Sequence, residues 1–135
     1  MRRLLPALAL LAGAAAGSAE ETHPFSVQDL VAMQRISDPS VAPDGARVTF
    51  TVRTTDLDAN RGRTDVWLAA VDGGWTKRLT SHPETDFGAR WSHDGKTLYF
   101  LSTRSGSSQV WKIAADGGEA QPVTSLPLDV ENLAV

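Results

Sequence analysis

The sequence contains no cysteine, so neither a disulfide bond nor a lipid-modified cysteine can contribute to this protein. Positive charge is also scarce, because 13 basic residues stand against 16 acidic ones, a net charge of −3. Two of the basic residues belong to the leader described next, which leaves 11 against 16. This balance is a poor match for nucleic acid or an anionic membrane surface. With 41% hydrophobic residues, the chain has the composition of a globular unit or part of one.

No hydrophobic run is long enough to cross a bilayer, which takes ~20 residues. The longest covers residues 4–16, after Arg2 and Arg3 and before the small residues 17–19. That arrangement is typical of a secretory signal peptide cleaved before Glu20. We therefore predict that residues 1–19 are a signal peptide. The mature chain is expected to be secreted or periplasmic, free of the membrane after cleavage, and held together by packing alone.

Residues 26–36 have the pattern of one short helix, within an N-terminal segment at 20–37. Ser26 can cap the first turn, Asp29 can complete a capping box, and Phe25 is placed to contact Leu30. The helix has a partly apolar face, so we expect it to pack against a larger body.

Beyond the helix the pattern changes to a period of two, which indicates strands. Val48, Phe50 and Val52 alternate with polar residues, so this strand is expected to bury one face. Residues 66–71 and 97–101 are apolar on both faces, as in strands between two layers. Asp-Gly pairs at 44–45, 72–73, 94–95 and 116–117 predict tight turns between strands. The body of the chain is therefore expected to be all β.

An internal repeat organises these strands. Trp67, Gly73-Gly74 and Leu79-Thr80-Ser81 return 44 positions later as Trp111, Gly117-Gly118 and Val123-Thr124-Ser125. The earlier run Ala42-Pro43-Asp44-Gly45 returns 50 positions later as Ser92-His93-Asp94-Gly95. The difference falls at residues 55–64, which lengthen one hairpin. Each copy reads as four short strands joined by tight turns.

Four strands at this period are typical of a β-propeller blade, whose period is about 40–45 residues. We predict a partial propeller over 38–135, with blade one at about 38–81, blade two at about 82–125 and the start of blade three at 126–135. A closed ring takes about four to eight blades, so two blades indicate a fragment.

Four runs carry a resemblance to a known family. They are Pro-Phe-Ser-Val-Gln-Asp-Leu at 24–30, Ile-Ser-Asp-Pro-Ser-Val-Ala-Pro-Asp-Gly at 36–45, Arg-Trp-Ser-His-Asp-Gly-Lys at 90–96 and Leu-Ser-Thr-Arg-Ser-Gly at 101–106. Together they resemble the start of secreted dipeptidyl-peptidase-like and acylaminoacyl-peptidase-like members of the prolyl oligopeptidase family. Periplasmic propellers of the TolB type share the Trp-Ser-x-Asp-Gly-Lys element, in which His93 replaces the usual proline. The capped helix leading into Ser-Asp-Pro-Ser-Val is the more specific part and favours the peptidases.

The resemblance implies a function for the full-length protein. In that family the propeller is a gate and a substrate-contacting lid over a following α/β-hydrolase domain, which supplies a Ser-Asp-His triad. The full-length protein is then expected to be a serine peptidase that hydrolyses short peptides. The nucleophile motif Gly-x-Ser-x-Gly does not occur in these 135 residues. We therefore expect this chain alone to be inactive, with no catalytic, cofactor-binding or metal residues of its own.

Other candidate site residues have plainer explanations. His23, His82 and His93 are the histidines of the chain, and each falls in a predicted loop or turn rather than beside a nucleophile. Asp56-x-Asp58-x-Asn60 is similar to the opening of a calcium loop, but Arg61 and Trp67 stand where that loop needs Gly and Glu. We predict a long polar hairpin loop there, whose neighbours Arg53, Arg61 and Arg63 could pair with a carboxylate.

The tryptophans divide into two groups. Trp67, Trp91 and Trp111 fall at repeated positions and are expected to pack between blades. Trp75 has no counterpart, because Glu119 stands at its place in the second copy, so it is the candidate for an exposed contact.

Two alternatives to the peptidase remain open. One is a non-enzymatic periplasmic propeller of the TolB type that binds protein partners, and the other is a truncated product without independent function. Peptide specificity, exo- or endopeptidase action and oligomeric state are not encoded in this part of the sequence. An isolated two-blade chain is expected to be marginally stable, because the blade interfaces on one side are missing.

Overall fold

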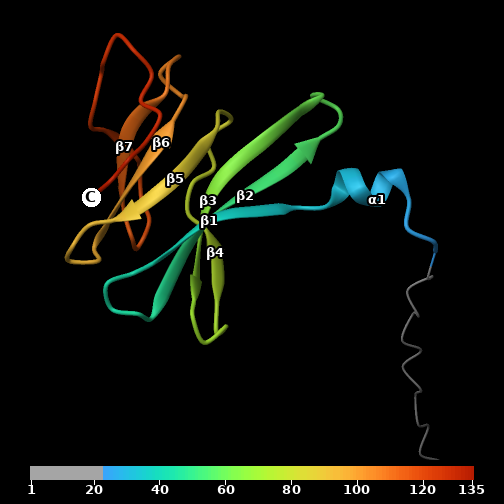
Figure 1. The fold of residues 1–135 in the computed structure, drawn as a ribbon, viewed down its shortest axis with the longest axis horizontal. Helices are drawn as coiled ribbons and strands as arrows, with labels where there is room; N and C mark the ends of the chain where they lie inside the picture. Colours follow the sequence, from blue (N-terminus) through green and yellow to red (C-terminus); the bar gives the residue numbers. More distant parts are fainter. Residues whose placement is uncertain (1–22) are drawn as a thin grey trace, which may run out of the picture.

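The computed structural model describes residues 23–135, which form one short helix and two antiparallel sheets (Figure 1). The elements are α1 (Val27–Ala32), β1 (Arg35–Val41), β2 (Arg47–Asp56), β3 (Arg61–Ala70), β4 (Thr76–Arg78), β5 (Asp86–Trp91), β6 (Thr97–Ser102), β7 (Gln109–Ala114) and β8 (Gln121–Pro122). The predicted signal peptide at 1–19 lies outside the described residues.

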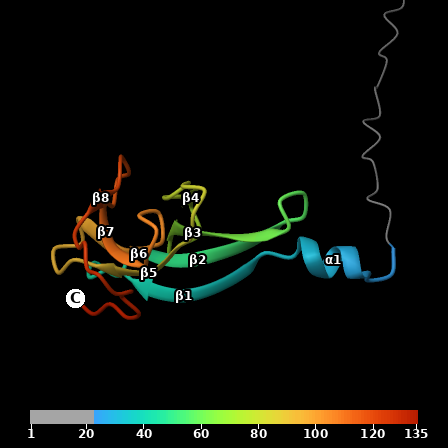
Figure 2. The ribbon, with the colours of Figure 1, turned by 90° about the horizontal axis from the view of Figure 1, so that it is seen from above.

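Each sheet contains four strands that neighbour one another in sequence order, β1-β2-β3-β4 and β5-β6-β7-β8. The two sheets lie side by side, with β5 against β1, β2 and β3 (Figures 1 and 2). This arrangement confirms the all-β prediction and is that of two propeller blades. We call the sheets blade one and blade two.

The repeat in the sequence is also a repeat of hydrogen bonds. The hydroxyl of Thr80 accepts the N–H of Val66 at 3.0 Å, and Thr124 accepts the N–H of Val110 at 2.9 Å in blade two. A bulge interrupts the pairing of β1 with β2 after Ser37, and the same irregularity follows Phe87 in β5. The two blades therefore share strand order, bulges and side-chain bonds to the backbone.

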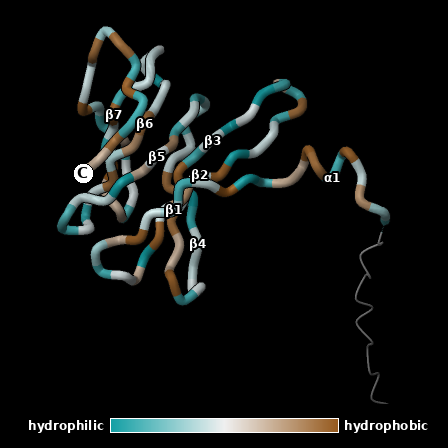
Figure 3. The backbone as a smooth tube through the Cα atoms, viewed as in Figure 1, coloured by the Kyte–Doolittle hydropathy of each residue, from teal (hydrophilic) through white to brown (hydrophobic). Residues whose placement is uncertain are grey.

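The core lies between the two blades (Figure 3). Blade one contributes Ala42, Val66 and Leu68, and blade two contributes residues of all its longer strands. The buried cluster consists of Ala42, Val66, Leu68, Ala89, Trp91, Leu98, Phe100, Ile113 and Ala115. Burying one Leu or Phe side chain contributes about 1.5–3 kcal/mol, so this junction is the main apolar contact of the fold.

The N-terminal helix is shorter than predicted. The expected helix over 26–36 ends at Ala32, because Met33 is extended and Arg35 and Ile36 begin β1, where they pair with β2. The predicted capping box is confirmed, since Ser26 and Asp29 exchange hydrogen bonds at both ends. Phe25 and Leu30 remain 70% and 50% exposed, so a contact between them buries little surface.

The expectation that Val48, Phe50 and Val52 form the buried face of β2 is confirmed only for Val52, which is 4% exposed. Its polar side chains Thr49 and Thr51 are 0% and 3% exposed, whereas Val48 and Phe50 are only half-buried. The threonine face lies toward blade two, and the hydroxyl of Thr49 is satisfied by donating to the carbonyl of Trp67 at 3.1 Å. A short polar side chain can therefore occupy the dry side of this strand.

The ten residues 55–64 are mostly strand rather than loop. Thr55 pairs with Gly62 and Asp56 pairs with Arg61, so only residues 57–60 form the turn. The insertion thus extends the β2–β3 hairpin beyond the sheet as a two-stranded arm, which runs from Thr54 to its partner Arg63 and lies beside α1 (Figure 1). The guanidinium of Arg53 lies where a Cβ on Gly62 would stand, so glycine permits this close contact.

After β8, side chains of blade two hold the chain in place. The amide of Gln109, which is 2% exposed, donates to the carbonyls of Leu126 and Leu128 and accepts the N–H of Leu126. Ser108 and Val130 also bond to each other. The predicted start of blade three thus lies along blade two, while the blade boundaries themselves stay predictions.

The backbone conformation at the two bulges can be tested by substituting Gly88. Asp38 and Gly88 occupy equivalent positions with φ of 51° and 63°. A Cβ on Gly88 would meet only Leu101 at an ordinary 3.9 Å. Gly88→Ala should therefore lower the free energy of unfolding by about 1–2 kcal/mol through backbone strain alone. Urea unfolding measures this, and Gly88→Asn should cost about half as much or less, since Asn tolerates positive φ. Equal losses for Ala and Asn would contradict this explanation.

Candidate functional site: the junction between the blades

The antiparallel strands give the two blades distinct ends. One end carries the four Asp-Gly turns, and we call it the Asp-Gly end. The other carries the arm at 54–63, the turn at 103–108 and the connection between the blades at 79–85, and we call it the hairpin end. The chain also enters β1 from α1 at the hairpin end (Figure 1). The hairpin whose length differs between the two copies therefore lies at the hairpin end, together with the connection between the blades, and loops of this kind often carry function.

A buried ion pair lies at the hairpin end of blade two. Asp86, which is fully buried, accepts bonds from Nη2 of Arg104 at 2.8 and 2.7 Å. The Nε of Arg104 donates to the hydroxyl of Ser102 at 2.8 Å. The guanidinium also stacks on two rings, 4.9 Å from the centroid of Trp111 and 5.5 Å from that of Phe100. Both carboxylate oxygens of Asp86 are therefore satisfied within the protein.

A second pair lies in blade one. Arg78 donates to Oδ2 of Asp65 at 2.7 Å, while Oδ1 of Asp65 is buried and has no hydrogen-bond partner. Burial raises the pKa of Asp65 above its usual value, and the bond from Arg78 opposes that shift. The charge of Asp86 adds to the increase. Folding therefore opposes the ionisation of Asp65.

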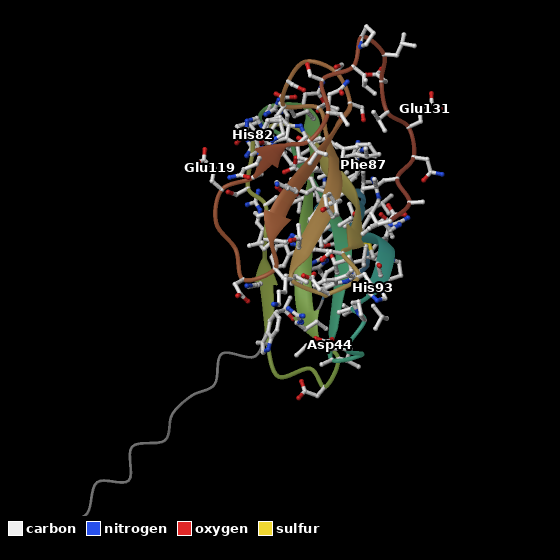
Figure 4. The ribbon with its side chains drawn as sticks, turned by 90° about the vertical axis from the view of Figure 1, so that its left-hand side faces the viewer. Asp44, His82, Phe87, His93, Glu119 and Glu131 are labelled. Carbon is white, nitrogen blue, oxygen red and sulfur yellow. The ribbon has the colours of Figure 1, made fainter. Side chains whose placement is uncertain are left out.

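A groove of about 340 Å³ runs between the outer strands of the blades. Leu79, Ile113 and Ala120 give it an apolar wall, and Arg104 also lines it. The remaining lining residues are Thr80, Ser81, His82, Pro83, Gly118 and Glu119. Figure 4 shows His82 and Glu119 toward the same end of the molecule. The groove offers hydroxyl, imidazole and carboxylate groups, but its Arg104 is already paired with Asp86.

The Asp-Gly end joins the blades differently. Arg47 donates to Asp44 within its own turn and to the carbonyl of Gly95 in blade two, both at 2.9 Å. Its guanidinium lies 4.8 Å from the ring centroid of Trp91, whose indole N–H donates to the carbonyl of Ser40. The Ala46 N–H bonded to Asp44 lowers the pKa of that carboxyl. Arg47 and Trp91 therefore join the two blades at this end.

The histidines do not come together. His23 lies before α1, with Nε2 3.6 Å from Asp29. Nδ1 of His82 accepts the N–H of Glu84, and His93 occupies the turn at the opposite end from His82 (Figure 4). Each histidine falls in the loop or turn that the sequence predicts.

The arm at 54–63 is held by charges. Asp56 accepts the N–H of Ala59 and lies 3.5 Å from Nε of Arg63, while Arg61 donates to the carbonyl of Pro83 at 3.2 Å. Two of the three arginines near this segment thus have a carboxylate within reach, the second being Arg61, 3.8 Å from Glu84. Among residues 23–135 no group of three His, Asp or Glu side chains could hold a metal ion.

The tryptophans follow the predicted division in part. Trp91 is 7% exposed in the core, and Trp111 is half-buried against it. Trp67 is half-buried on the side of blade one that faces away from blade two. Trp75 is 43% exposed, with Nζ of Lys77 5.9 Å from its ring centroid.

Sequence reasoning did not identify the two ion pairs. Their members lie 13 and 18 residues apart, and no motif connects them. Only the strand register brings Asp86 opposite Ser102 and so beside Arg104. Once the strand register is known, a buried aspartate such as Asp86 indicates that a side chain of opposite charge lies beside it.

The buried pair of Asp86 and Arg104 can be tested by removing its acid. Asp86→Ala leaves the Arg104 side chain, 12% exposed, without its counter-charge. Breaking a buried pair in this way typically costs about 3–5 kcal/mol, so the urea midpoint should fall sharply or the fold should be lost. Asp116→Ala, an exposed turn acid, is the matched control and should change stability by less than about 0.5 kcal/mol. Equal effects of the two variants would contradict the assigned role of Asp86.

The raised pKa of Asp65 makes the stability of the fold depend on pH. Because folding raises the pKa of Asp65, the folded state binds its proton more tightly than the unfolded state. The stability linked to this group is present below the unfolded value of about 3.9 and is lost as the pH rises through the folded value. Asp65→Asn removes this dependence. The difference in unfolding free energy, wild type minus Asp65→Asn, should therefore decrease from pH 3.5 to pH 7, and a difference that increases would refute the assignment.

The sequence of this chain is similar to those of two kinds of known protein, peptidases and TolB proteins. The family model described as TolB beta propeller domain matches residues 27–131. Dipeptidyl-peptidase 5 of Porphyromonas endodontalis is 32% identical over 98 residues, which is 73% of this chain and 14% of that protein. The Tol-Pal system protein TolB of Anaeromyxobacter dehalogenans is 39% identical over 50 residues, or 37% of this chain and 10% of that protein. The chain thus spans only a small part of these relatives.

The solved structures whose fold resembles this chain are of the same two kinds. The AtxE2 isopeptidase matches with a TM-score of 0.71 and 24% identity, over 83% of this chain and 22% of its own. A TolB-like protein from Agrobacterium tumefaciens matches with a TM-score of 0.52 and 29% identity, over 64% of this chain and 29% of its own. Among the described residues no helix is long and apolar enough to cross a membrane. The family match covers most of the chain and both blades, and the chain belongs to the TolB β-propeller domain family.

Proposed function

We propose that this chain is the N-terminal propeller segment of a secreted serine peptidase of the prolyl oligopeptidase family, which hydrolyses short peptides in its full-length form. The extent of the peptidase likeness is the observation that carries the proposal. The dipeptidyl-peptidase match covers 73% of the chain, against 37% for the TolB match. The isopeptidase fold match covers 83%, against 64% for the TolB-like structure.

The geometry is compatible with a lid over a catalytic domain. The helix α1, the arm at 54–63 and the groove beside Arg104 all lie toward the hairpin end, so a domain docked there would meet variable loops. The Asp-Gly end consists of tight turns, and its Arg47 and Trp91 are engaged between the blades, which leaves fewer groups for substrate. Catalysis would come from outside these 135 residues, because they contain no nucleophile motif.

A TolB-like binding protein is the second candidate. The observation in its favour is the higher identity of the TolB match, 39%, although over only 50 residues. Such a protein would bind protein partners without a catalytic domain. The two candidates therefore differ in whether a serine nucleophile is present in the same polypeptide.

The test is the native polypeptide in cells of the source organism. An antibody against residues 38–125 detects it, and a serine-directed fluorophosphonate probe reports a reactive serine. We expect a band several times heavier than this chain that labels in the periplasmic or secreted fraction and begins at Glu20. A heat-denatured sample controls for non-specific labelling. An unlabelled band of any size would refute the peptidase proposal and favour the binding protein.

A further inference from the structure

The four Asp-Gly turns share one backbone arrangement. In each turn the N–H of the glycine donates to the carbonyl of the residue three positions earlier, at 2.9 or 3.0 Å. The aspartate side chain is exposed in every turn. These aspartates are Asp44, Asp72, Asp94 and Asp116. The turns therefore differ chiefly in what holds the carboxylate.

Three of the carboxylates are held by their own turn. Asp44, Asp72 and Asp94 each accept the N–H of the residue two positions later, at 2.9, 2.9 and 3.0 Å. Bonds of this kind fix the aspartate side chain against the backbone. Among residues 23–135, no hydrogen bond or ion pair holds the carboxylate of Asp116, whose only contact of this type is through its backbone carbonyl. The fourth turn therefore has a free carboxylate.

The backbone of the fourth turn explains this difference. Gly117 has a φ of 110°, against 69°, 80° and 67° for the corresponding glycines of the other three turns. Gly118 follows with a φ of 118°, whereas Gly74, its counterpart in blade one, does not have a positive φ. The N–H of Gly74 reaches the carboxylate of its turn, and the N–H of Gly118 does not reach that of Asp116.

A neighbouring blade is not expected to supply the missing bond. Asp72 occupies the same place in blade one that Asp116 occupies in blade two, and blade two already lies beside blade one. Among residues 23–135, the carboxylate of Asp72 accepts only the N–H of Gly74 from its own turn. Blade one reaches Asp116 only at the backbone, where Nζ of Lys77 donates to its carbonyl at 3.1 Å. The repeat therefore indicates that the carboxylate of Asp116 stays free between two blades of a ring.

We propose that Asp116 is a site of spontaneous modification, at which the aspartate converts to isoaspartate through a cyclic imide. The amide nitrogen of Gly117 attacks Cγ of Asp116. A C–N bond forms, the C–OH bond breaks, and the amide proton leaves with the hydroxyl as water. Water then adds to either imide carbonyl and gives aspartate or isoaspartate. The attack is open because glycine has no side chain in the way, and the inference does not rest on the proposed peptidase.

The other three turns hinder the same reaction. Cγ must turn toward the glycine nitrogen, which breaks the bond that holds the carboxylate on the next residue. The attacked carboxyl must also carry a proton, because its hydroxyl leaves as water. The N–H of Ala46 lowers the pKa of Asp44 and so keeps that group ionised. The hydroxyl of Ser92 does the same for Asp94, whose pKa is also lowered.

The product would alter the junction at the Asp-Gly end. In isoaspartate the main chain runs through Cβ, which inserts a methylene group into the turn. The imide consumes the N–H of Gly117 and with it the bond to the carbonyl of Ala114. The turn leads into β8, which has only 2 residues, and it carries the carbonyl that Lys77 of blade one binds. Modification is therefore expected to loosen β8 and its link to blade one.

The experiment follows isoaspartate in the native polypeptide. The protein is isolated with the antibody against residues 38–125 and incubated in its folded state at mildly acidic pH. Trypsin then leaves the four Asp-Gly turns in four different peptides, in which electron-transfer fragmentation counts isoaspartate. We expect Asp116 to convert roughly 2–10 times faster than Asp72, the factor that one hydrogen bond supplies. Asp44 and Asp94, which accept further bonds, should convert no faster than Asp72.

Unfolding supplies the matched control, because Asp72 and Asp116 share the sequence Asp-Gly-Gly. In concentrated urea neither turn has a fixed backbone, so the lead of Asp116 should disappear. Removing a bond should have the opposite effect, and Ser92→Ala should raise the rate at Asp94 about twofold or more while Asp44 stays unchanged. Equal rates at Asp116 and Asp72 in the folded protein, or the same lead of Asp116 in urea, would overturn the inference.

Discussion

The structure depends on one constraint, that a four-stranded blade has two faces and cannot leave both in water. Blade two solves this on one side by placing Leu98, Phe100 and Ile113 against Val66 and Leu68 of blade one. The apolar area removed there must offset the ordering of both sheets, at about 1–2 kcal/mol per residue of backbone. Neither sheet has a core of its own, so each blade is stable only as the neighbour of another. Ile36, Val41 and Val71, on the side of blade one away from blade two, have the apolar character that a neighbouring blade requires.

How much of this follows from the sequence differs between backbone and side chains. The turns, the repeat and the four-strand blade follow from Asp-Gly spacing and alternation, because such signals are local. The end of the helix at Ala32 does not, since β1 takes Arg35 and Ile36 by pairing with a strand further along the chain. Residues 55–64 are predicted as a loop because their polar side chains lack the alternation of a half-buried strand. An arm with both faces in water needs no such alternation.

The sequence predicts less well which face of each strand is buried. Alternation marks which residues share a side, but it does not say which side meets another blade. On β2 the threonines face the dry junction, and the apolar side faces outward. A sheet in the interior of a propeller is covered on both sides, so the polarity of a residue no longer reports its burial. The ion pairs do not follow from the sequence for a similar reason. Asp86 is buried in a strand, and only the fold brings Arg104 to it.

The two ends of the blades are held together by different kinds of interaction, and this difference bears on where variation can be tolerated. At the Asp-Gly end, bonds between residues a few positions apart close the turns, such as the N–H of Ala46 with Asp44 and that of Lys96 with Asp94. Arg47 and Trp91 then link the two blades at this end. These turns form from local sequence and need little from the rest of the fold. At the hairpin end, Arg61, Arg78 and Arg104 reach partners 13 to 22 positions away. The pairs of Arg78 and Arg104 lie within single blades, so loops there can change length while these side chains hold the strands of each blade together. An end that tolerates new loops around a fixed frame is where propellers of one family can acquire different partners.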